Sequence, residues 1–370
     1  MKIKNFNGQV DRSRVLVAPL DWGLGHATRC IPIINRLLQL DYEVIIAGKG
    51  PSRHLLEKEF PNLTYIDLNG YDVRYARNKY LMPVKLLMQF PKIIFSVYSE
   101  HLWLKKIVKK YSIDLVISDN RLGLYHNTIP CVYITHQLKI KTGNLFSERL
   151  AQKIHYRFIN KYNKCWVPDA NGKINLAGEL SHPAVFPKTP VQYLGPLSRF
   201  ENSPAEIKYD LTIILSGPEP QRTIFEKIVL TGLEKTNGRV LLVRGLPADG
   251  PILKTSFSFL EIQNHFPATE LNRAILQSRL IISRCGYSTV MDLVKLQKKA
   301  ILVPTPGQTE QEYLGTYLSE QKLFFCVKQE SFSLPEALKE VNNFCFSETT
   351  FPQNEHEKII DSFFKKIMKD

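Results

Sequence analysis

Short apolar runs alternate with amphipathic segments along almost the whole chain. In the first half, runs with the length of strands lie at 14–20, 43–48, 114–119, 130–135 and 164–169. Residues 26–40 have helical periodicity. Strands that are apolar throughout, rather than at every second position, are typical of parallel sheets covered by helices on both faces. The first half therefore predicts a doubly wound α/β domain.

The same alternation restarts in the second half of the chain. Strand-like runs lie at 211–217, 239–245, 257–263, 279–284, 299–305 and 323–327. Helical patterns lie at 221–235, 269–278, 288–297 and 309–321, followed by a last amphipathic helix at 356–370. The predicted fold is therefore α/β, with two successive Rossmann-like, doubly wound domains.

A polar, proline-containing segment at 196–208 separates the two halves and is interpreted as a linker. It leaves a first domain at 1–195 and a second domain at 209–350. The C-terminal helix at 351–370 could cross back to the first domain.

Composition narrows the class of protein. With 44% hydrophobic and 23% charged residues, the chain is not disordered, collagen-like or a coiled coil. The six cysteines are scattered without C-x-x-C spacing, which argues against a zinc site or a disulfide framework and favours a reducing cytoplasm. We expect neither a secretory signal nor a transmembrane helix, because no suitable apolar stretch is present.

Positive charge is concentrated in the first half. Residues 1–200 contain 29 basic and 14 acidic residues, whereas the rest of the chain is balanced. Such asymmetry indicates an anionic partner or a solvated basic face. The stretch 78–110 mixes lysines with Leu, Phe, Tyr and Trp, which suits either peripheral attachment to the inner face of a membrane or helices packed on a sheet. No regular basic–aromatic platform is present, so no nucleic acid partner is expected.

The first strand is followed by a glycine-rich loop that contains Gly23 and Gly25 and leads directly into a helix. Backbone N–H groups at such a helix start can bind an anion. Thr28 replaces the third glycine of the dinucleotide fingerprint, and strand 43–48 ends without an acid, so NAD binding is poorly supported. No phosphate-binding P-loop motif is present.

His26 lies in this loop, at the edge of the sheet where ligands bind in such folds. It could act as a general base, or it could cap the helix or contact substrate. Asp119 ends another strand and could hydrogen-bond His26 and fix its tautomer. Arg121, His126 and His136 follow on nearby loops. Together with Gly23 and Gly25 they are candidates for the acceptor side of a site, although an ordinary loop role is open for each of the three.

Three polar loops follow strands of the second half. Ser216 and Gly217 could hold a phosphate through their amides, and Arg222 lies in the next helical turn. The loop after 279–284 and the helix that follows it contribute Arg284, Gly286, Ser288, Thr289 and Asp292. The loop after 299–305 leads to Gln311 and Glu312. Gly286, Ser288 and Thr289 open a helix, which favours a pyrophosphate site. Each residue alone could be a helix cap, but three such loops at strand ends indicate a site.

These loops resemble those of the GT-B glycosyltransferases, in which two such domains face a cleft, and especially those of family 28. That family includes peptidoglycan N-acetylglucosaminyltransferases and monogalactosyldiacylglycerol synthases. The resemblance is carried by SRCGYSTVMDL with KAILVPTPGQTEQEYL (283–314) and by GLGHATR (23–29). GHATR and SGPEPQRT also resemble a bacterial subgroup of predicted glycosyltransferases. WGLGH and SGPEP contain fewer glycines than the corresponding loops of the peptidoglycan enzyme.

The resemblance implies roles for these residues. The second domain would bind a nucleotide sugar, with the base held by 265–268, including Phe266 and Ala268. The diphosphate would lie on Gly286, Ser288 and Thr289, beneath Ser216 and Gly217, with Arg284 at the same loop. Asp292 would bind the ribose, and Gln311 and Glu312 the sugar. His26 would take the acceptor proton with help from Asp119.

The predicted function is inverting transfer of a hexose or N-acetylhexosamine from a nucleotide sugar, with UDP as the expected nucleotide, to an acceptor hydroxyl. No metal or cofactor is expected beyond this co-substrate, and the acceptor could be lipid-linked or anionic. Two alternatives stay open: a nucleotide-sugar epimerase of the same fold, and a non-catalytic nucleotide- or polyanion-binding protein.

Overall fold

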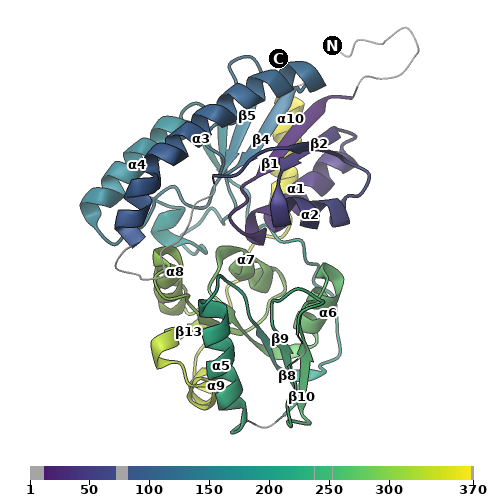
Figure 1. Cartoon of the computed structure of the whole chain (residues 1–370), viewed down its shortest axis with the longest axis vertical. Helices are drawn as coiled ribbons and strands as arrows, with labels where there is room; N and C mark the ends of the chain where they lie inside the picture. The colour runs from purple at the N-terminus through teal and green to yellow at the C-terminus, as the bar shows by residue number, and fades with distance from the viewer. Residues whose placement is uncertain (1–11, 72–81, 237, 252, 368–370) are drawn as a thin grey trace. The chain divides into compact units, whose positions relative to one another are not determined.

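The computed structural model describes residues 12–71, 82–236, 238–251 and 253–367 (Figure 1). These residues form two units. The first contains Met1–Asn175, Glu179–Arg199 and Pro352–Asp370, and the second contains Leu176–Gly178 and Phe200–Phe351. The chain therefore leaves the first unit at Arg199 and returns to it at Pro352.

The first unit is built on seven parallel strands in the order β3-β2-β1-β4-β5-β6-β7. The strands are β1 (Arg14–Pro19), β2 (Glu43–Gly48), β3 (Thr64–Asp67), β4 (Leu115–Asp119), β5 (Cys131–Ile134), β6 (Lys164–Val167) and β7 (Val191–Tyr193). The sequence pattern did not predict β3 and β7, because both are short and only partly buried.

Helices connect these strands: α1 (Leu24–Gln39), α2 (Gly50–Glu59), α3 (Met82–Tyr111) and α4 (Leu145–Ile159). Residues from α3 and α4 pack into one cluster with every second residue of the central strands, such as Leu16 and Ala18 of β1. The two helices therefore cover the same face of the sheet. No described helix, α3 included, has an apolar stretch long enough to cross a bilayer.

The C-terminal helix α10 (Glu355–Ile367) belongs to the first unit. It packs against α1, where the Arg36 guanidinium pairs with the Asp361 carboxylate at 2.8 Å and 2.5 Å. The predicted return of this helix to the first domain is therefore present.

The second unit is built on six parallel strands in the order β10-β9-β8-β11-β12-β13. The strands are β8 (Tyr209–Ile214), β9 (Val240–Val243), β10 (Leu260–Gln263), β11 (Ser278–Arg284), β12 (Ala300–Val303) and β13 (Phe325–Cys326). The helices are α5 (Gln221–Leu233), α6 (Ala268–Leu276), α7 (Tyr287–Lys295), α8 (Thr309–Glu320) and α9 (Leu334–Asn342). Two doubly wound α/β units confirm the predicted fold class.

Candidate active site

The carboxyl ends of β1 and β4 bring His26 and Asp119 together. The two strands are neighbours, and Pro19 at the end of β1 pairs with Asp119 at the end of β4. Gly23 has a φ of 101°, a backbone conformation that favours glycine, and it turns the chain into α1. His26 Nδ1 consequently lies 3.3 Å and 3.4 Å from the two Asp119 carboxylate oxygens. The contact expected from the sequence is present.

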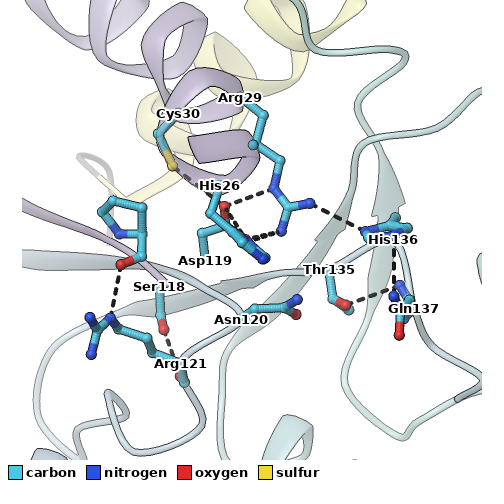
Figure 2. A network of polar contacts seen from close by, with 12 residues as sticks. His26, Arg29, Cys30, Ser118, Asp119, Asn120, Arg121, Thr135, His136 and Gln137 are labelled. Carbon is cyan, nitrogen blue, oxygen red and sulfur yellow. Dashed lines mark hydrogen bonds and ion pairs between the residues drawn. The ribbon is translucent and has the colours of Figure 1, made fainter. Parts of the chain in front are cut away.

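A third residue, Arg29, shares this site (Figure 2). Its guanidinium donates from Nε to Asp119 Oδ2 at 2.7 Å and from Nη2 to Asp119 Oδ1. Nη2 also lies 2.7 Å from His26 Nδ1, and Nη1 lies 3.2 Å from Nδ1 of His136. Arg29 therefore joins one carboxylate and two imidazoles into a single network.

Burial is nearly complete at this network. The side chains of Asp119 and Arg29 are 0% and 2% exposed, and that of His26 is 14% exposed. A buried carboxylate is costly unless it is paired and hydrogen-bonded, and the Arg29 guanidinium meets that need with two donors. The Cys30 thiol adds a weaker contact to Asp119 Oδ2 at 3.7 Å.

Protonation at the site follows from these contacts. Burial and the neighbouring Arg29 cation lower the pKa of His26, although Asp119 opposes the shift. Burial alone would raise the pKa of Asp119, but the Arg29 and His26 charges and hydrogen bonds hold it below its ordinary value. At neutral pH the site therefore holds a carboxylate, a guanidinium and an uncharged His26 ring.

Arg29 was not among the residues singled out from the sequence, although it stands in the quoted segment GLGHATR. The available signal was its position three residues after His26, on the same face of α1. His136, a predicted acceptor-side residue, does lie in the network. It is 4% exposed and follows β5, the neighbour of β4.

The structure does not bring the other two acceptor-side candidates to this site. Arg121 is buried and pairs with Glu100 of α3 at 2.7 Å, while donating to the carbonyl of Pro19 at 2.9 Å. His126 lies beside the start of β5 and near Lys105 and Lys109 of α3. The loop after β4 must return to the opposite edge to begin the parallel strand β5, and it carries His126 away from His26.

In the second unit, the loops after β8 and β12 approach each other. Gly217 has a φ of 97°, and a Cβ built there would lie 3.7 Å from the Thr305 hydroxyl oxygen. That hydroxyl is buried, and it has no hydrogen-bond partner among the described residues. Ser216 and Gly217 themselves are exposed. The expected gathering of these strand-end loops is present.

The loop after β11 leads into α7 at the same sheet edge. Gly286 is the N-cap residue of α7, and only open space and the Thr289 hydroxyl surround the position of its absent Cβ. Ser288 and Thr289 lie in the first helical turn and Asp292 in the second, all partly buried. The N-terminus of α7 therefore presents backbone N–H groups with room beside them, an arrangement that suits an anion.

Arg284 and Arg222, which were expected to contact the nucleotide-sugar donor, are paired with groups of the protein instead. Arg284 is 2% exposed, donates to the Gln221 carbonyl at 2.8 Å and to Gln329 Oε1 at 2.6 Å, and stacks on Phe225. Burial lowers the pKa of Arg284 to about 10. Arg222 is 5% exposed and pairs with Glu219 at 2.6 Å. Both arginines are buried and stabilise neighbouring loops through these bonds, so we do not assign them to the nucleotide-sugar site.

The remaining candidates lie at the carboxyl edge of the second sheet or just beyond it. Gln311 Oε1 accepts from the backbone N–H of Thr305 at 2.9 Å, and Glu312 Oε1 accepts from that of Gly307 at 2.8 Å. Both side chains therefore shape the loop after β12. Phe266 packs partly buried on the cluster around Tyr209, and Ala268 begins α6 after β10.

Comparison with known proteins decides the class. Residues 253–370 match the model of the glycosyltransferase family 28 C-terminal domain. The chain is a glycosyltransferase with a family 28 C-terminal domain.

Two relatives of this glycosyltransferase extend the match over more of the chain. An "uncharacterized glycosyltransferase" of Methanosarcina mazei is 23% identical over 331 residues, covering 81% of each chain. The UDP-N-acetylglucosamine--N-acetylmuramyl-(pentapeptide) pyrophosphoryl-undecaprenol N-acetylglucosamine transferase of Staphylococcus aureus is 20% identical, covering 94% of this chain and 96% of its own.

Solved structures agree with the GT-B fold of this glycosyltransferase. The glycosyltransferase of kitacinnamycin superposes with a TM-score of 0.66 at 11% identity, over 90% of this chain and 91% of its own. MurG of Acinetobacter baumannii superposes with a TM-score of 0.55 at 13% identity, over 95% and 99%. Among the described residues, no cluster of His, Cys, Asp and Glu is arranged to hold a metal ion.

Proposed function

We propose that this glycosyltransferase moves a hexose or N-acetylhexosamine from a UDP-linked donor to an acceptor hydroxyl, with inversion and without a metal ion or further cofactor. The observation that carries the proposal is the buried contact between His26 and Asp119 at the carboxyl edge of the first sheet. A neutral imidazole against a carboxylate is the arrangement that general-base catalysis needs.

The acceptor oxygen forms its bond to the anomeric carbon as the bond from that carbon to the donor phosphate oxygen breaks. The acceptor proton passes to His26 Nε2, and the electron pair of the broken bond leaves with the diphosphate. Asp119 stabilises the imidazolium through Nδ1–H. Attack from the face opposite the leaving group inverts the anomeric configuration.

The donor half of the proposal rests on the edge of the second sheet. The N-terminus of α7, with Gly286 as its N-cap, favours negative charge through its N–H groups and its dipole. The buried Thr305 hydroxyl can donate a hydrogen bond beside Gly217. These neutral groups would stabilise a leaving diphosphate, in the place of the arginines expected from the sequence.

Uridine is proposed as the nucleoside of the donor, because the relative from Staphylococcus aureus is named for UDP-N-acetylglucosamine. A similar rhamnosyltransferase structure is described as complexed with thymidine diphosphate, so thymidine is the comparison to make. The experiment is incubation of UDP-glucose and UDP-N-acetylglucosamine with and without acceptors, followed by analysis of products. Acceptor-dependent UDP release and an inverted glycoside support the proposal. An epimerised sugar without acceptor, or binding without turnover, would contradict it.

A lipid-linked acceptor and a peripheral position on the inner face of a membrane are also proposed. Support comes from the α3–α4 face, defined by the exposed side chains of Phe95, Tyr98, Leu102, Leu145, Phe146 and Leu150. Phe95 and Phe146 are 71% and 79% exposed. Exposed lysines and arginines accompany them, including Lys106, Arg149 and Lys153. An apolar surface among cations suits an anionic bilayer. Residues 78–81 of the predicted stretch lie outside the described residues.

Vesicle flotation tests this face. We expect the protein to float with anionic vesicles and to lose that association when Phe95 and Phe146 are both changed to serine. Ile224→Ser, at an exposed apolar residue of α5 in the second unit, is the matched control and should change nothing. No flotation at low salt would overturn the membrane proposal while leaving the transfer proposal intact.

A further inference from the structure

Arg29 makes three kinds of contact that the proposed reaction does not use. It pairs with Asp119 through two donors, reaches His136 Nδ1 through Nη1, and lies with Nη2 at 2.7 Å from His26 Nδ1 (Figure 2). The last contact is the critical one. It places a cationic donor on the same ring nitrogen that faces the carboxylate.

His26 Nδ1 cannot satisfy both neighbours in one protonation state. A neutral ring carries its proton on one nitrogen only. With the proton on Nδ1 the ring donates to Asp119, but that hydrogen then faces the N–H of Arg29. With the proton on Nε2, the Nδ1 lone pair accepts from Arg29.

The distances separate the two states. Nδ1 is 2.7 Å from Arg29 Nη2, the length of a charge-assisted hydrogen bond, and 3.3 Å and 3.4 Å from the Asp119 oxygens. The closer partner is the donor, so the geometry fits an unprotonated Nδ1. That tautomer has no lone pair on Nε2 with which to take an acceptor proton.

We propose that Arg29 is a positioning residue that holds His26 in the tautomer protonated on Nε2, so that transfer begins only after Nη2 releases Nδ1. This inference rests on the proposed role of His26 as the base. The change of tautomer loses one proton from Nε2 to solvent and gains one on Nδ1 from solvent, so the charge of the site is unchanged.

Release of Nδ1 need not detach Arg29. Its Nε still donates to Asp119 Oδ2, and its Nη1 still contacts His136 on the loop after β5. The ionisable groups that face His26 and Arg29 are therefore Asp119 from β4, His136 from that loop and, through Asp119, the Cys30 thiol of α1. Because the guanidinium is a rigid planar fork, its nitrogens cannot shift separately, and a small rotation of the His26 ring is the movement that would end the contact with Nη2.

The test is ¹⁵N NMR of the histidine rings in the full-length protein without substrate. The His26 signals are identified as those missing in His26→Gln. We expect the wild-type neutral ring to carry its proton on Nε2. In Arg29→Met we expect the proton on Nδ1, facing Asp119, and a titration midpoint raised by about 1 unit or more, because an adjacent cation is lost.

A control on the same helix separates this effect from general damage to α1. Arg36→Met removes another paired arginine, the one that binds Asp361 of α10. It should leave the His26 tautomer and midpoint unchanged.

Two outcomes would overturn the proposal: a wild-type ring protonated on Nδ1, or an Arg29→Met ring with the wild-type tautomer and midpoint. The first does not depend on Arg29→Met, so it decides the matter even if that variant fails to fold. No substrate is used, and failure of the transfer proposal in turnover assays would therefore leave this result readable on its own.

Discussion

The carboxyl edges of the two sheets differ in how their buried charged side chains are paired. At the first edge, a buried carboxylate and a buried guanidinium pair with each other and hold two imidazoles. At the second edge, Arg222 and Arg284 turn inward to loop carbonyls and side chains, and the N-terminus of α7 and a buried hydroxyl line the sheet end. This difference fits the proposed roles, in which the first edge moves a proton and the second receives an anion through uncharged groups.

The largest stability difference is expected from removing the charge at the first edge. Asp119→Asn leaves the buried Arg29 cation without its carboxylate, which should cost about 3–5 kcal/mol of unfolding free energy. Denaturant unfolding measures this cost.

Glu312→Gln is the counterpart of that change at the second edge. Its exposed carboxylate accepts one hydrogen bond, from the Gly307 N–H, which the Gln amide oxygen can still accept, so the change should cost about 1 kcal/mol or less. Equal costs for the two variants would break the contrast between the edges.

Arg284→Met tests whether Arg284 contributes to folding stability or to binding of the nucleotide-sugar donor. Loss of the bonds to the Gln221 carbonyl and Gln329 should lower stability by about 2–3 kcal/mol, with UDP affinity nearly unchanged in the folded protein. Isothermal titration and thermal unfolding together measure both quantities. A large loss of UDP affinity with intact stability would return Arg284 to the donor site.

Thr305→Val removes a buried hydroxyl that has no partner among the described residues. Stability without ligand should be unchanged or slightly higher, whereas UDP binding should weaken by about 1 kcal/mol, roughly fivefold.

Thr212→Val is the matched control for Thr305→Val. The Thr212 hydroxyl already bonds that of Ser278 at 2.6 Å, so its loss should reduce stability and leave UDP affinity alone. The idea of a donor contact fails if Thr305→Val binds UDP as the wild type does.

The smallest effect concerns pH. Because the pKa of His26 is lowered in the folded protein, its neutral burial contributes stability that is fully present above the unfolded pKa of 6.5. That contribution is lost as the pH falls through the lowered folded value. Replacing His26 by Gln should therefore flatten the decline of unfolding free energy below pH 6.5. Parallel curves for the two proteins, from urea unfolding at several pH values, would contradict the lowered pKa.

Much of the fold and one contact of the site could be predicted from the sequence. Continuous apolar strands with intervening helices fix parallel pairing, and parallel pairing places His26 and Asp119 at one edge. The short strands β3 and β7 escaped prediction because partly buried edges carry little periodic signal. The helices α2, α4 and α9 also went unpredicted.

Charged residues were the least predictable. Arg29, Arg222 and Arg284 occupy ordinary helix or strand-end positions in the sequence, and only their partners far along the chain decide whether each is buried. His126 was expected near His26 because it follows Asp119 closely, but the loop carries it back along the sheet. Only the first few residues after the end of a strand can be expected to lie near the carboxyl edge of the sheet.

The most direct test of the account compares His26→Ala with His126→Ala in the transfer assay, with UDP affinity measured for each. If His26 is the base, its loss should lower kcat/KM for transfer by ~10²–10⁴-fold while UDP still binds. His126→Ala should keep wild-type activity, because that residue lies at the other edge of the sheet. A folded His26→Ala protein that transfers sugar at the wild-type rate would contradict the central claim.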